Sequence, residues 1–406
     1  KQYKKIDFLS EENAVAVYLN PEQYKSSTGL GTNPLIFPFG CNKSQYFAVE
    51  QAILNRISVI EGPPGTGKTQ TILNIIANLL IRQKTVQVVS NNNSAVENIA
   101  EKLSLPKYGL DFFVASLGHQ KKKQTFIESQ NRVYPDFSKW ETDQNGNSVS
   151  ESEITTHGKK LQTVYEMQNR LAVWTEELKA VEIEQKHFLL VMENTKMPEM
   201  VLPKELPSDK ILLLCQELEA FLKGERKMSF LKKLRFRFTY GFSFCFFKKQ
   251  NRDTVIPGLQ SLYYQKRISE IHSEMNRLQQ ALKNVDADEL SRKYIEDSLS
   301  YFRKYLADQY GKRKSRIIFS EDDLWKQPGA FLMEYPVVLS TTYTARSSLG
   351  KNAQFDYVII DEASQVDVAT GALAVSCARN AVIVGDSKQL PNVVTRQQKE
   401  SLEKVF

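Results

Sequence analysis

The chain has 406 residues, of which 41% are apolar and 25% charged, and these proportions exclude a wholly disordered or fibrous protein. Its 54 basic and 47 acidic side chains leave a formal net charge of +7, which permits nucleic-acid binding but does not require it. No uninterrupted apolar stretch reaches the roughly 20 residues of a membrane-spanning helix, so no integral membrane association is expected.

Six short β-branched runs lie towards the two ends of the chain, each followed by a helical or turn signal. They are residues 58–61, 86–90, 112–115, 337–340, 357–361 and 381–385. Continuous apolar strands that alternate with helices are typical of a parallel sheet covered on both faces. The predicted fold class is therefore α/β, with a lead-in over residues 1–44 and a sheet domain in two parts, 45–118 and 316–406.

A glycine-rich loop follows the first run and precedes an apolar helical stretch, Gln70–Leu80. Strand, loop and helix form the context of a phosphate-binding loop, in which backbone N–H groups and the helix N-terminus surround phosphate oxygens. We expect Lys68 to reach the β- and γ-phosphates and the Thr69 hydroxyl to bind Mg²⁺. A glycine turn with a purely structural role is the alternative. The predicted loop consists of Gly62, Pro63, Pro64, Gly65, Thr66, Gly67, Lys68 and Thr69.

Residues 119–315 differ in sequence pattern from the two ends of the chain and are predicted to form a helical insertion. Two segments carry a heptad spacing of apolar residues, one from Val164 to Met192 and one from Tyr264 to Val285. Such a seam is buried against another helix. Both seams lie in one chain, so an antiparallel intramolecular coiled-coil stalk is predicted, with an intermolecular coiled coil as the alternative.

The tip of this stalk is predicted over about residues 193–257. Basic and aromatic residues interleave between Arg226 and Lys249, and no acidic residue occurs there. This segment fits a nucleic-acid contact, or a basic patch for a membrane surface or a protein partner. The structural alternative is a β-hairpin around Tyr240-Gly241, because Phe236, Phe238 and Tyr240 alternate as in a half-buried strand.

Two adjacent carboxylates end the fifth run, at Asp361 and Glu362. In parallel sheets the carboxyl ends of the strands lie at one edge, so these acids should approach the phosphate-binding loop. We expect Asp361 to hold Mg²⁺ and Glu362 to orient or deprotonate the attacking water.

These motifs resemble those of superfamily 1 helicases, in the 5′-to-3′ branch that contains the nonsense-mediated-decay RNA helicase. Asp361–Gln365 resembles motif II and residues 384–391 resemble motif III, in which the glutamine, here Gln389, senses the γ-phosphate. Asn42–Gln45 resembles the upstream Q motif, which implies that Gln45 reads the adenine edge. The resemblance implies a RecA-like P-loop NTPase lobe that binds ATP and Mg²⁺.

The same resemblance implies contacts with single-stranded RNA or DNA. Residues 88–99 resemble motif Ia and Leu339–Thr342 resembles the following strand-end motif, both of which contact the nucleic-acid backbone in that family. Small polar groups at strand ends suit sugar–phosphate contacts without base selectivity, although capping of the following helix is the alternative. The candidate residues are Asn92, Asn93, Ser340, Thr341 and Thr342.

Two positions depart from the family pattern. Asn91 stands where the family usually has proline, and Asn392 follows Pro391 where a second proline is usual. Neither is among the residues expected to carry the chemistry. The motifs of a second RecA-like lobe, which supply arginine fingers worth roughly 10³–10⁵ in rate, do not occur before Phe406. ATP binding with weak hydrolysis is therefore expected of this fragment.

Three other classes compete with an ATP-dependent helicase or translocase. A P-loop kinase or GTPase is disfavoured, since the sole N-K pair, Asn42-Lys43, precedes the loop and lacks the aspartate of a guanine motif. An ATP-gated scaffold whose stalk recruits a protein partner is the remaining alternative.

The four cysteines and four histidines are scattered, without a C-x-x-C pair or a zinc-site spacing. This usage predicts reduced thiols in an intracellular protein, cytoplasmic or nuclear. The chain begins at Lys1, and residues 1–10 lack the apolar core of a signal peptide, so a fragment of something longer is expected.

Overall fold

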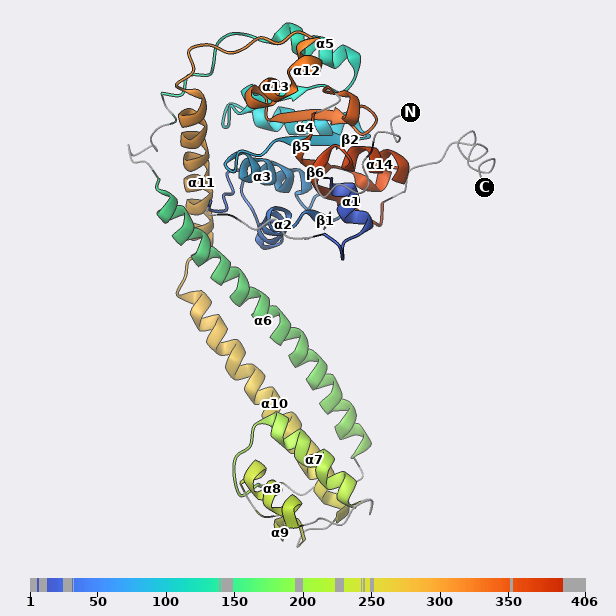
Figure 1. Cartoon of the computed structure of the whole chain (residues 1–406). Coiled ribbons are helices and arrows are strands. Elements are labelled where there is room, and N and C mark those ends of the chain that lie inside the picture. Colours follow the sequence, from blue (N-terminus) through green and yellow to red (C-terminus); the bar gives the residue numbers. More distant parts are fainter. Residues whose placement is uncertain are drawn as a thin grey trace, which may run out of the picture. The chain divides into compact units, whose positions relative to one another are not determined.

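Six strands form a single sheet in which every neighbouring pair is parallel (Figure 1). The computed structural model describes residues 6, 13–24, 31, 33–138, 140, 149–193, 200–222, 230–241, 243, 245–248, 252–350 and 353–389. The strands are β1 (Ile57–Glu61), β2 (Val86–Ser90), β3 (Val114–Ser116), β4 (Val337–Thr341), β5 (Phe355–Ile360) and β6 (Ala378–Gly385), in the order β1-β6-β5-β2-β4-β3. The predicted α/β class with a parallel sheet is confirmed.

Each strand corresponds to one of the six predicted runs, with one displacement. The run at 112–115 begins as a 3-10 turn, Asp111–Phe113, and extends as β3 only from Val114. Successive side chains of a strand point to opposite faces. Here the rings of Phe112 and Phe113 both contact one helix, Ala287–Tyr310. The ring centroid of Phe112 lies 5.2 Å from that of Tyr310, and that of Phe113 lies 6.5 Å from that of Phe302. The turn lets two consecutive aromatic residues be buried together.

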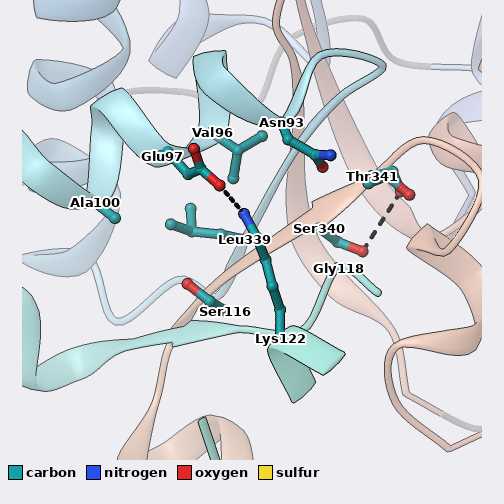
Figure 2. Close-up of a pocket in the computed structure, with 10 residues that line it drawn as sticks. All are labelled: Asn93, Val96, Glu97, Ala100, Ser116, Gly118, Lys122, Leu339, Ser340 and Thr341. Atoms are coloured by element: carbon teal, nitrogen blue, oxygen red, sulfur yellow. Dashed lines mark hydrogen bonds and ion pairs between the residues drawn. The ribbon is translucent and has the colours of Figure 1, made fainter. Parts of the chain in front are cut away.

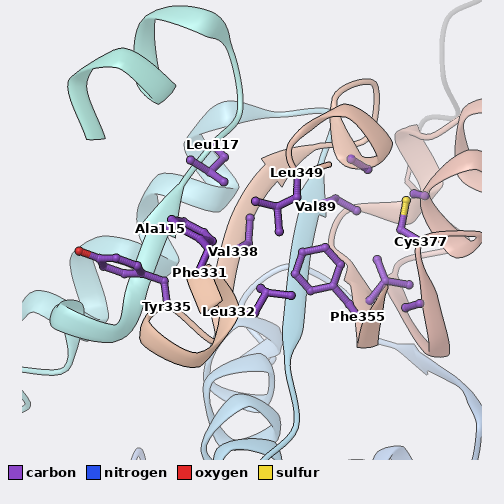
Figure 3. Packing of buried hydrophobic residues seen from close by; sticks show 14 of the residues in the cluster. Val89, Ala115, Leu117, Phe331, Leu332, Tyr335, Val338, Leu349, Phe355 and Cys377 are labelled. Carbon is purple, nitrogen blue, oxygen red and sulfur yellow. The ribbon is translucent and has the colours of Figure 1, made fainter. Parts of the chain in front are cut away.

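Helices cover the sheet in the manner expected of buried parallel strands. The elements α1 (Ala14–Leu19), α5 (Gln120–Ser129), α12 (Asp323–Lys326), α13 (Pro328–Glu334) and α14 (Val368–Val375) pack on one side. Figure 3 shows Phe331, Val338 and Phe355 in the apolar core that they share with the strands. The helices α2 (Lys43–Leu54), α3 (Lys68–Leu80) and α4 (Asn93–Ser104) contact one another in chain order and pack against β1, β2 and β4.

A second compact unit consists of residues 161–287, and the first contains residues 1–160 and 288–406. The second unit holds most of α6 (Glu151–Val191), together with α7 (Ser208–Leu222), α8 (Phe230–Tyr240), α9 (Cys245–Lys248) and α10 (Arg252–Lys283). The helix α11 (Ala287–Tyr310) returns the chain to the first unit, so α5 and α11 belong with the sheet although the sequence assigns them to the insertion. Within the described residues, no helix has both the length and the apolar character needed to cross a membrane.

The long helices α6 and α10 run antiparallel within the second unit. Arg170 of α6 forms an ion pair with Glu274 of α10 at 3.8 Å, and Phe188 of α6 contacts Tyr264 of α10 at 5.5 Å between ring centroids. Residues later in α6 thus contact residues earlier in α10, as antiparallel helices do. Every predicted seam position from Val164 to Met192 is buried or half-buried. The predicted helical insertion is confirmed.

The β-hairpin considered around Tyr240-Gly241 is wrong, because the segment forms helix α8. Phe236 and Tyr240 lie four residues apart on one face and are buried with their ring centroids 4.6 Å apart, whereas Phe238 is 80% exposed. Gly241 ends the helix with a φ of +79°. Phe247 is buried in the same cluster, with Phe246 packed against it, whereas Phe242 and Phe244 lie outside the described residues.

Candidate functional site

The carboxyl edge of the sheet brings the sequence motifs together in two groups. The neighbouring strands β1, β6 and β5 end at the phosphate-binding loop, at motif III and at motif II. The other three, β2, β4 and β3, end at motif Ia, at the strand-end motif after Leu339 and at Ser116. Motif Ia thus follows the strand between the two groups, since β2 pairs with both β5 and β4.

The phosphate-binding loop, residues 62–69, connects β1 to the N-terminus of α3. Gly65 and Gly67 have φ values of +85° and +82°, in the left-handed region that favours glycine. The N–H of Gly62 donates to Gly385 O at 3.1 Å and continues the β1–β6 pairing into the loop. Lys68 begins the helix, and its ammonium group donates to Gly62 O at 2.6 Å. This bond holds the Lys68 cation over the loop, where a phosphate would lie.

Gln45 lies behind this loop and is 6% exposed. Its Nε2 donates to Thr66 O at 3.2 Å and to Gly67 O at 3.3 Å. Its Oε1 accepts from the N–H of Asn42 at 2.8 Å, in a capping box at the start of α2. Both ends of the amide are therefore engaged by the protein, and Gln45 supports the loop. Its expected contact with adenine stays a prediction.

Two buried asparagines of α3 attach the segment before Gln45 to this helix. Asn74 donates to Gly40 O at 2.8 Å and accepts from the N–H of Phe39 at 3.2 Å. Asn78 makes the same pair of bonds with Ile36, at 2.6 and 3.0 Å. Both side chains are fully buried, so these bonds satisfy backbone groups that have no strand partner. They position the Q motif against the phosphate-binding loop.

The carboxylates of motif II lie just beyond β5. Asp361 is 5% exposed, and burial raises the pKa of its carboxyl above the ordinary 3.8. A hydrogen bond from the N–H of Glu362, at 2.9 Å, and the Lys68 ammonium charge oppose that rise. The Lys68 charge thus bears on the Asp361 carboxyl from the loop after β1, at the sheet edge where β5 also ends. Sequence reasoning expected this convergence.

Glu362 has a left-handed backbone, with a φ of +53°, which is uncommon for a non-glycine residue. Its Oε2 atom is buried and has no hydrogen-bond partner within the described chain. Strained backbone and unpaired buried oxygens are characteristic of functional positions. An acceptor of this kind suits the orientation of a water molecule.

Motif III completes this half of the edge. Asp386 is 7% exposed and accepts from the N–H of Lys388 at 2.9 Å. The N–H of Gln389 donates to Asp386 O at 3.1 Å and closes a turn after β6. Gln389 is the last residue described before the C-terminal segment, and the remaining positions of motif III, Leu390 and Pro391, lie outside the described residues.

Magnesium fits this donor set through one carboxylate and one hydroxyl, Asp361 and Thr69. Mg²⁺ in nucleotide sites is usually bound by one or two protein ligands, with phosphate oxygens and waters completing the octahedron. Groups of three or more His, Cys, Asp or Glu side chains suited to a metal are absent from the part of the chain that the structure describes. The chemistry therefore fits a metal that is carried with the nucleotide.

A small pocket lies at the other half of the edge, between α4, α5 and the ends of β3 and β4 (Figure 2). Asn93, Ser340 and Thr341, three of the five candidate nucleic-acid contacts, line it, and their contact with nucleic acid stays a prediction. The hydroxyls of Ser340 and Thr341 both bond to Thr344 Oγ1, at 2.9 and 2.8 Å. Sequence reasoning missed Ser116, Gly118, Glu97 and Lys122, which also line the pocket.

Lys122 forms an ion pair with Glu97 across this pocket (Figure 2). It belongs to a run of three lysines, 121–123, that opens α5 shortly after β3. A basic run just after a strand is the signal that the sequence offers, although the predicted insertion, 119–315, includes these residues. The pair holds one cation beside the polar groups of Asn93 and Thr341.

The remaining two candidates do not line the pocket. Asn92 caps α4, accepting from the N–H of Ser94 at 3.0 Å, as the capping alternative predicts, and its contact with nucleic acid stays a prediction. Thr342 is 1% exposed and its hydroxyl donates to Asn91 Oδ1. Asn91 was set apart from the chemistry, yet its Nδ2 also donates to Gln365 O of motif II at 2.7 Å.

Comparison with known families matches residues 40–397 to a family described as AAA domain. An uncharacterized ATP-dependent helicase of Mycoplasma genitalium is 39% identical over 98 residues, which are 24% of this chain and 8% of that protein. The DNA polymerase alpha-associated DNA helicase A of Schizosaccharomyces pombe is 47% identical over 64 residues, 16% of this chain and 10% of that protein.

A further relative is the Drosophila melanogaster homolog of regulator of nonsense transcripts 1. It is 43% identical over 63 residues, which are 15% of this chain and 5% of that protein. The chain thus matches a tenth or less of the length of these curated relatives.

Proposed function

Because this chain belongs to the AAA domain family and matches the N-terminal RecA-like lobe of superfamily 1 helicases, we propose that it is an ATP-binding motor lobe. In this proposal ATP hydrolysis drives movement along single-stranded RNA or DNA. The observation that carries it is the shared carboxyl edge: the phosphate-binding loop after β1, motif II after β5 and the pocket beyond β3 and β4 follow strands of one parallel sheet.

The nucleotide half of the proposal assigns roles to residues at β1, β6 and β5. Lys68 binds the β- and γ-phosphates, and Thr69 with Asp361 holds Mg²⁺. Glu362 orients the attacking water through its unpaired buried oxygen, and Gln389 senses the γ-phosphate. When bound, Mg²⁺ supplies charge neutralisation at the phosphates.

The nucleic-acid half assigns backbone contacts to the pocket of Figure 2. Asn93 and Thr341 offer neutral hydrogen-bonding groups, and Lys122 offers a cation to a phosphate. Ser340 holds Thr341 through their shared partner Thr344. Contacts of this kind are common to RNA and DNA, so both are proposed as ligands.

A binding titration tests the two halves together. The probes are a fluorescein-labelled 20-nucleotide single strand, as RNA and as DNA, and Mg²⁺ with a non-hydrolysable ATP analogue. Lys122→Ala should weaken strand binding and reduce the slope of log K against log salt by about 1. Lys326→Ala is the control, since it removes a 70% exposed cation from α12. Strand affinity that is unchanged in Lys122→Ala, or equally reduced in Lys326→Ala, would remove the pocket from the proposal.

The unit of residues 161–287 is proposed as a separate interaction module. Its helix α8 exposes Leu231 and Phe238, at 75% and 80%, on the side away from its buried rings. Exposed apolar groups among cations suit a protein partner, which is the observation in favour of a recruiting function. Deletion of this unit should abolish partner recruitment by the parent protein and leave nucleotide binding intact.

A further inference from the structure

Asn91 connects the two halves of the carboxyl edge. It follows β2, the strand that pairs with β5 on one side and with β4 on the other. Its Oδ1 accepts from the Thr342 hydroxyl after β4, and its Nδ2 donates to Gln365 O after β5. One side chain thus joins three strand ends. Proline, the usual residue in the family that the motif resembles, has no side-chain amide and could make neither bond.

The bond to Gln365 acts on the turn that carries Glu362. Residues 363–365 form a 3-10 turn, closed by a bond from the N–H of Gln365 to Glu362 O at 2.9 Å. Asn91 holds the carbonyl at the far end of this turn. A displacement of Asn91 would therefore move the backbone on which the left-handed Glu362 is placed.

The bond from Thr342 links the same amide to the nucleic-acid pocket. Thr342 directly follows Thr341, which lines that pocket, and its hydroxyl is buried against Asn91. A strand that engages Thr341 and Ser340 would act on Thr342 through the peptide between them. Asn91 thus adds a side-chain hydrogen-bonded route between the two halves of the edge to the backbone pairing of β2 with β4 and β5.

We propose that Asn91 is a positioning residue that couples nucleic-acid binding at the pocket to the placement of Glu362 in motif II. This inference rests on the proposed function, because it needs both ligands at their proposed halves of the edge. Coupling of this kind is a free energy shared between two sites, and each ligand changes the affinity of the other by the same factor.

The test measures that factor in the 406-residue chain. The affinity for Mg²⁺ and a non-hydrolysable ATP analogue is measured by calorimetry with and without a saturating 20-nucleotide single strand. Wild type should show a change of at least about fivefold, the lower end of typical coupling. In Asn91→Ala the factor should fall below about twofold, with the nucleotide affinity in the absence of the strand nearly unchanged.

Two further variants separate the bonds. Thr342→Val removes only the hydroxyl, and Asn91→Asp keeps the acceptor for Thr342 but loses the donor to Gln365. Both should lower the coupling factor, and the Asn91→Ala, Thr342→Val double variant should lower it no further than Asn91→Ala alone. Asn380→Ala is the matched control, because the side-chain amide of Asn380 likewise donates to a backbone carbonyl, Asp356 O at 2.9 Å.

Three kinds of result from these measurements would overturn the coupling proposal. A wild-type coupling factor in Asn91→Ala, or an equal loss in Asn380→Ala, overturns the proposal and leaves a structural role. Wild type that binds both ligands with a factor near 1 also overturns it, while the proposed function stands. Wild type that fails to bind either the nucleotide or the strand overturns the proposed function and the coupling with it.

Discussion

The side-chain amide of Gln45 lies directly against the backbone of Gly67, donating to its carbonyl oxygen at 3.3 Å. A Cβ atom at position 67 would lie 2.1 Å from Gln45 Nε2. The phosphate-binding loop is therefore packed from behind by the Q motif as well as shaped by its own glycines.

Gly67→Ala should consequently destroy nucleotide binding and destabilise the chain. The new methyl group would displace Gln45, and the φ of +82° costs an L-residue about 1–2 kcal/mol. Thermal unfolding and calorimetry with the Mg²⁺–ATP analogue measure the two effects. In Gly371→Ala, the control, the new Cβ meets only Val366 at 3.6 Å in a helix, so stability should rise slightly. Retained affinity in Gly67→Ala would show that this contact is dispensable.

Asn74→Leu should lower the free energy of unfolding by about 2–5 kcal/mol, because it leaves Gly40 O and the N–H of Phe39 buried without partners. Urea denaturation measures the loss. The nucleotide affinity should fall too, since the displaced segment leads into the Q motif. A stability within about 0.5 kcal/mol of wild type would mean that water replaces both bonds.

Glu334 is the acidic centre of a buried network where the chain returns from α11 to the sheet. It is 2% exposed and accepts from Arg316 Nε at 2.8 Å and from the Tyr134 hydroxyl at 2.7 Å. Glu334→Ala should cost about 3–5 kcal/mol, because the Arg316 guanidinium loses its counter-ion.

Urea denaturation of Glu334→Ala beside Asp322→Ala checks this expectation. Asp322 pairs with Lys326 at 2.8 Å and both side chains are exposed, so its loss should cost less than about 1 kcal/mol. Equal losses in the two variants would contradict the role of the network.

Asp361→Asn should stabilise the chain at neutral pH in the absence of Mg²⁺. Burial raises the pKa of Asp361 above 3.8, so the folded state binds its proton more tightly than the unfolded state. Protonation of Asp361 therefore stabilises the folded state. This contribution to the free energy of unfolding is complete below pH 3.8 and is lost as the pH rises through the folded-state pKa of Asp361. The side-chain oxygen of the new asparagine at position 361 can still accept from the N–H of Glu362. The variant therefore removes a charge and keeps this hydrogen bond, with Asn91 and Glu362 themselves unaltered.

The gain in the free energy of unfolding in Asp361→Asn should therefore shrink as the pH falls towards 3.8. Mg²⁺-dependent nucleotide binding should be lost in this variant at every pH. Denaturation curves at several pH values measure the first effect and calorimetry the second. A gain in stability that does not depend on pH would assign the effect to packing instead of ionisation.

Deletion of residues 161–287, joined by a short Gly-Ser linker, should leave nucleotide affinity within about threefold of wild type, since these residues form their own compact unit. Calorimetry on the deletion variant decides this. Failure of the variant to fold would show that the insertion contributes to the core of the sheet unit.

The sequence was sufficient to predict the six strands and their common edge, because buried parallel strands are continuous apolar runs that punctuate the chain. The same reasoning placed Lys68 at the start of the helix after β1 and Asp361 just beyond β5, while their contacts with phosphate and Mg²⁺ stay predictions. It placed α8 wrongly, since a spacing of two between Phe236, Phe238 and Tyr240 also places the first and last on one helical face.

Partnerships across strands were beyond sequence reasoning. The bonds of Asn91 to Thr342 and Gln365 join positions 251 and 274 residues apart, and no local pattern marks them. The Lys122–Glu97 pair likewise depends on α5 lying beside α4, which follows from the strand order and not from any periodicity.

The most direct test of the central claim is a calorimetric titration of wild type and Lys68→Ala with Mg²⁺ and a non-hydrolysable ATP analogue, with Lys84→Ala as a control at the opposite edge of the sheet. Wild type and Lys84→Ala should bind one nucleotide alike, and Lys68→Ala should bind about 100-fold more weakly, as expected for the loss of a charge-assisted bond worth about 3 kcal/mol. Its thermal unfolding should be nearly unchanged, because among the described residues the Lys68 ammonium group donates a single hydrogen bond, to Gly62 O. Wild-type affinity in Lys68→Ala would contradict the account.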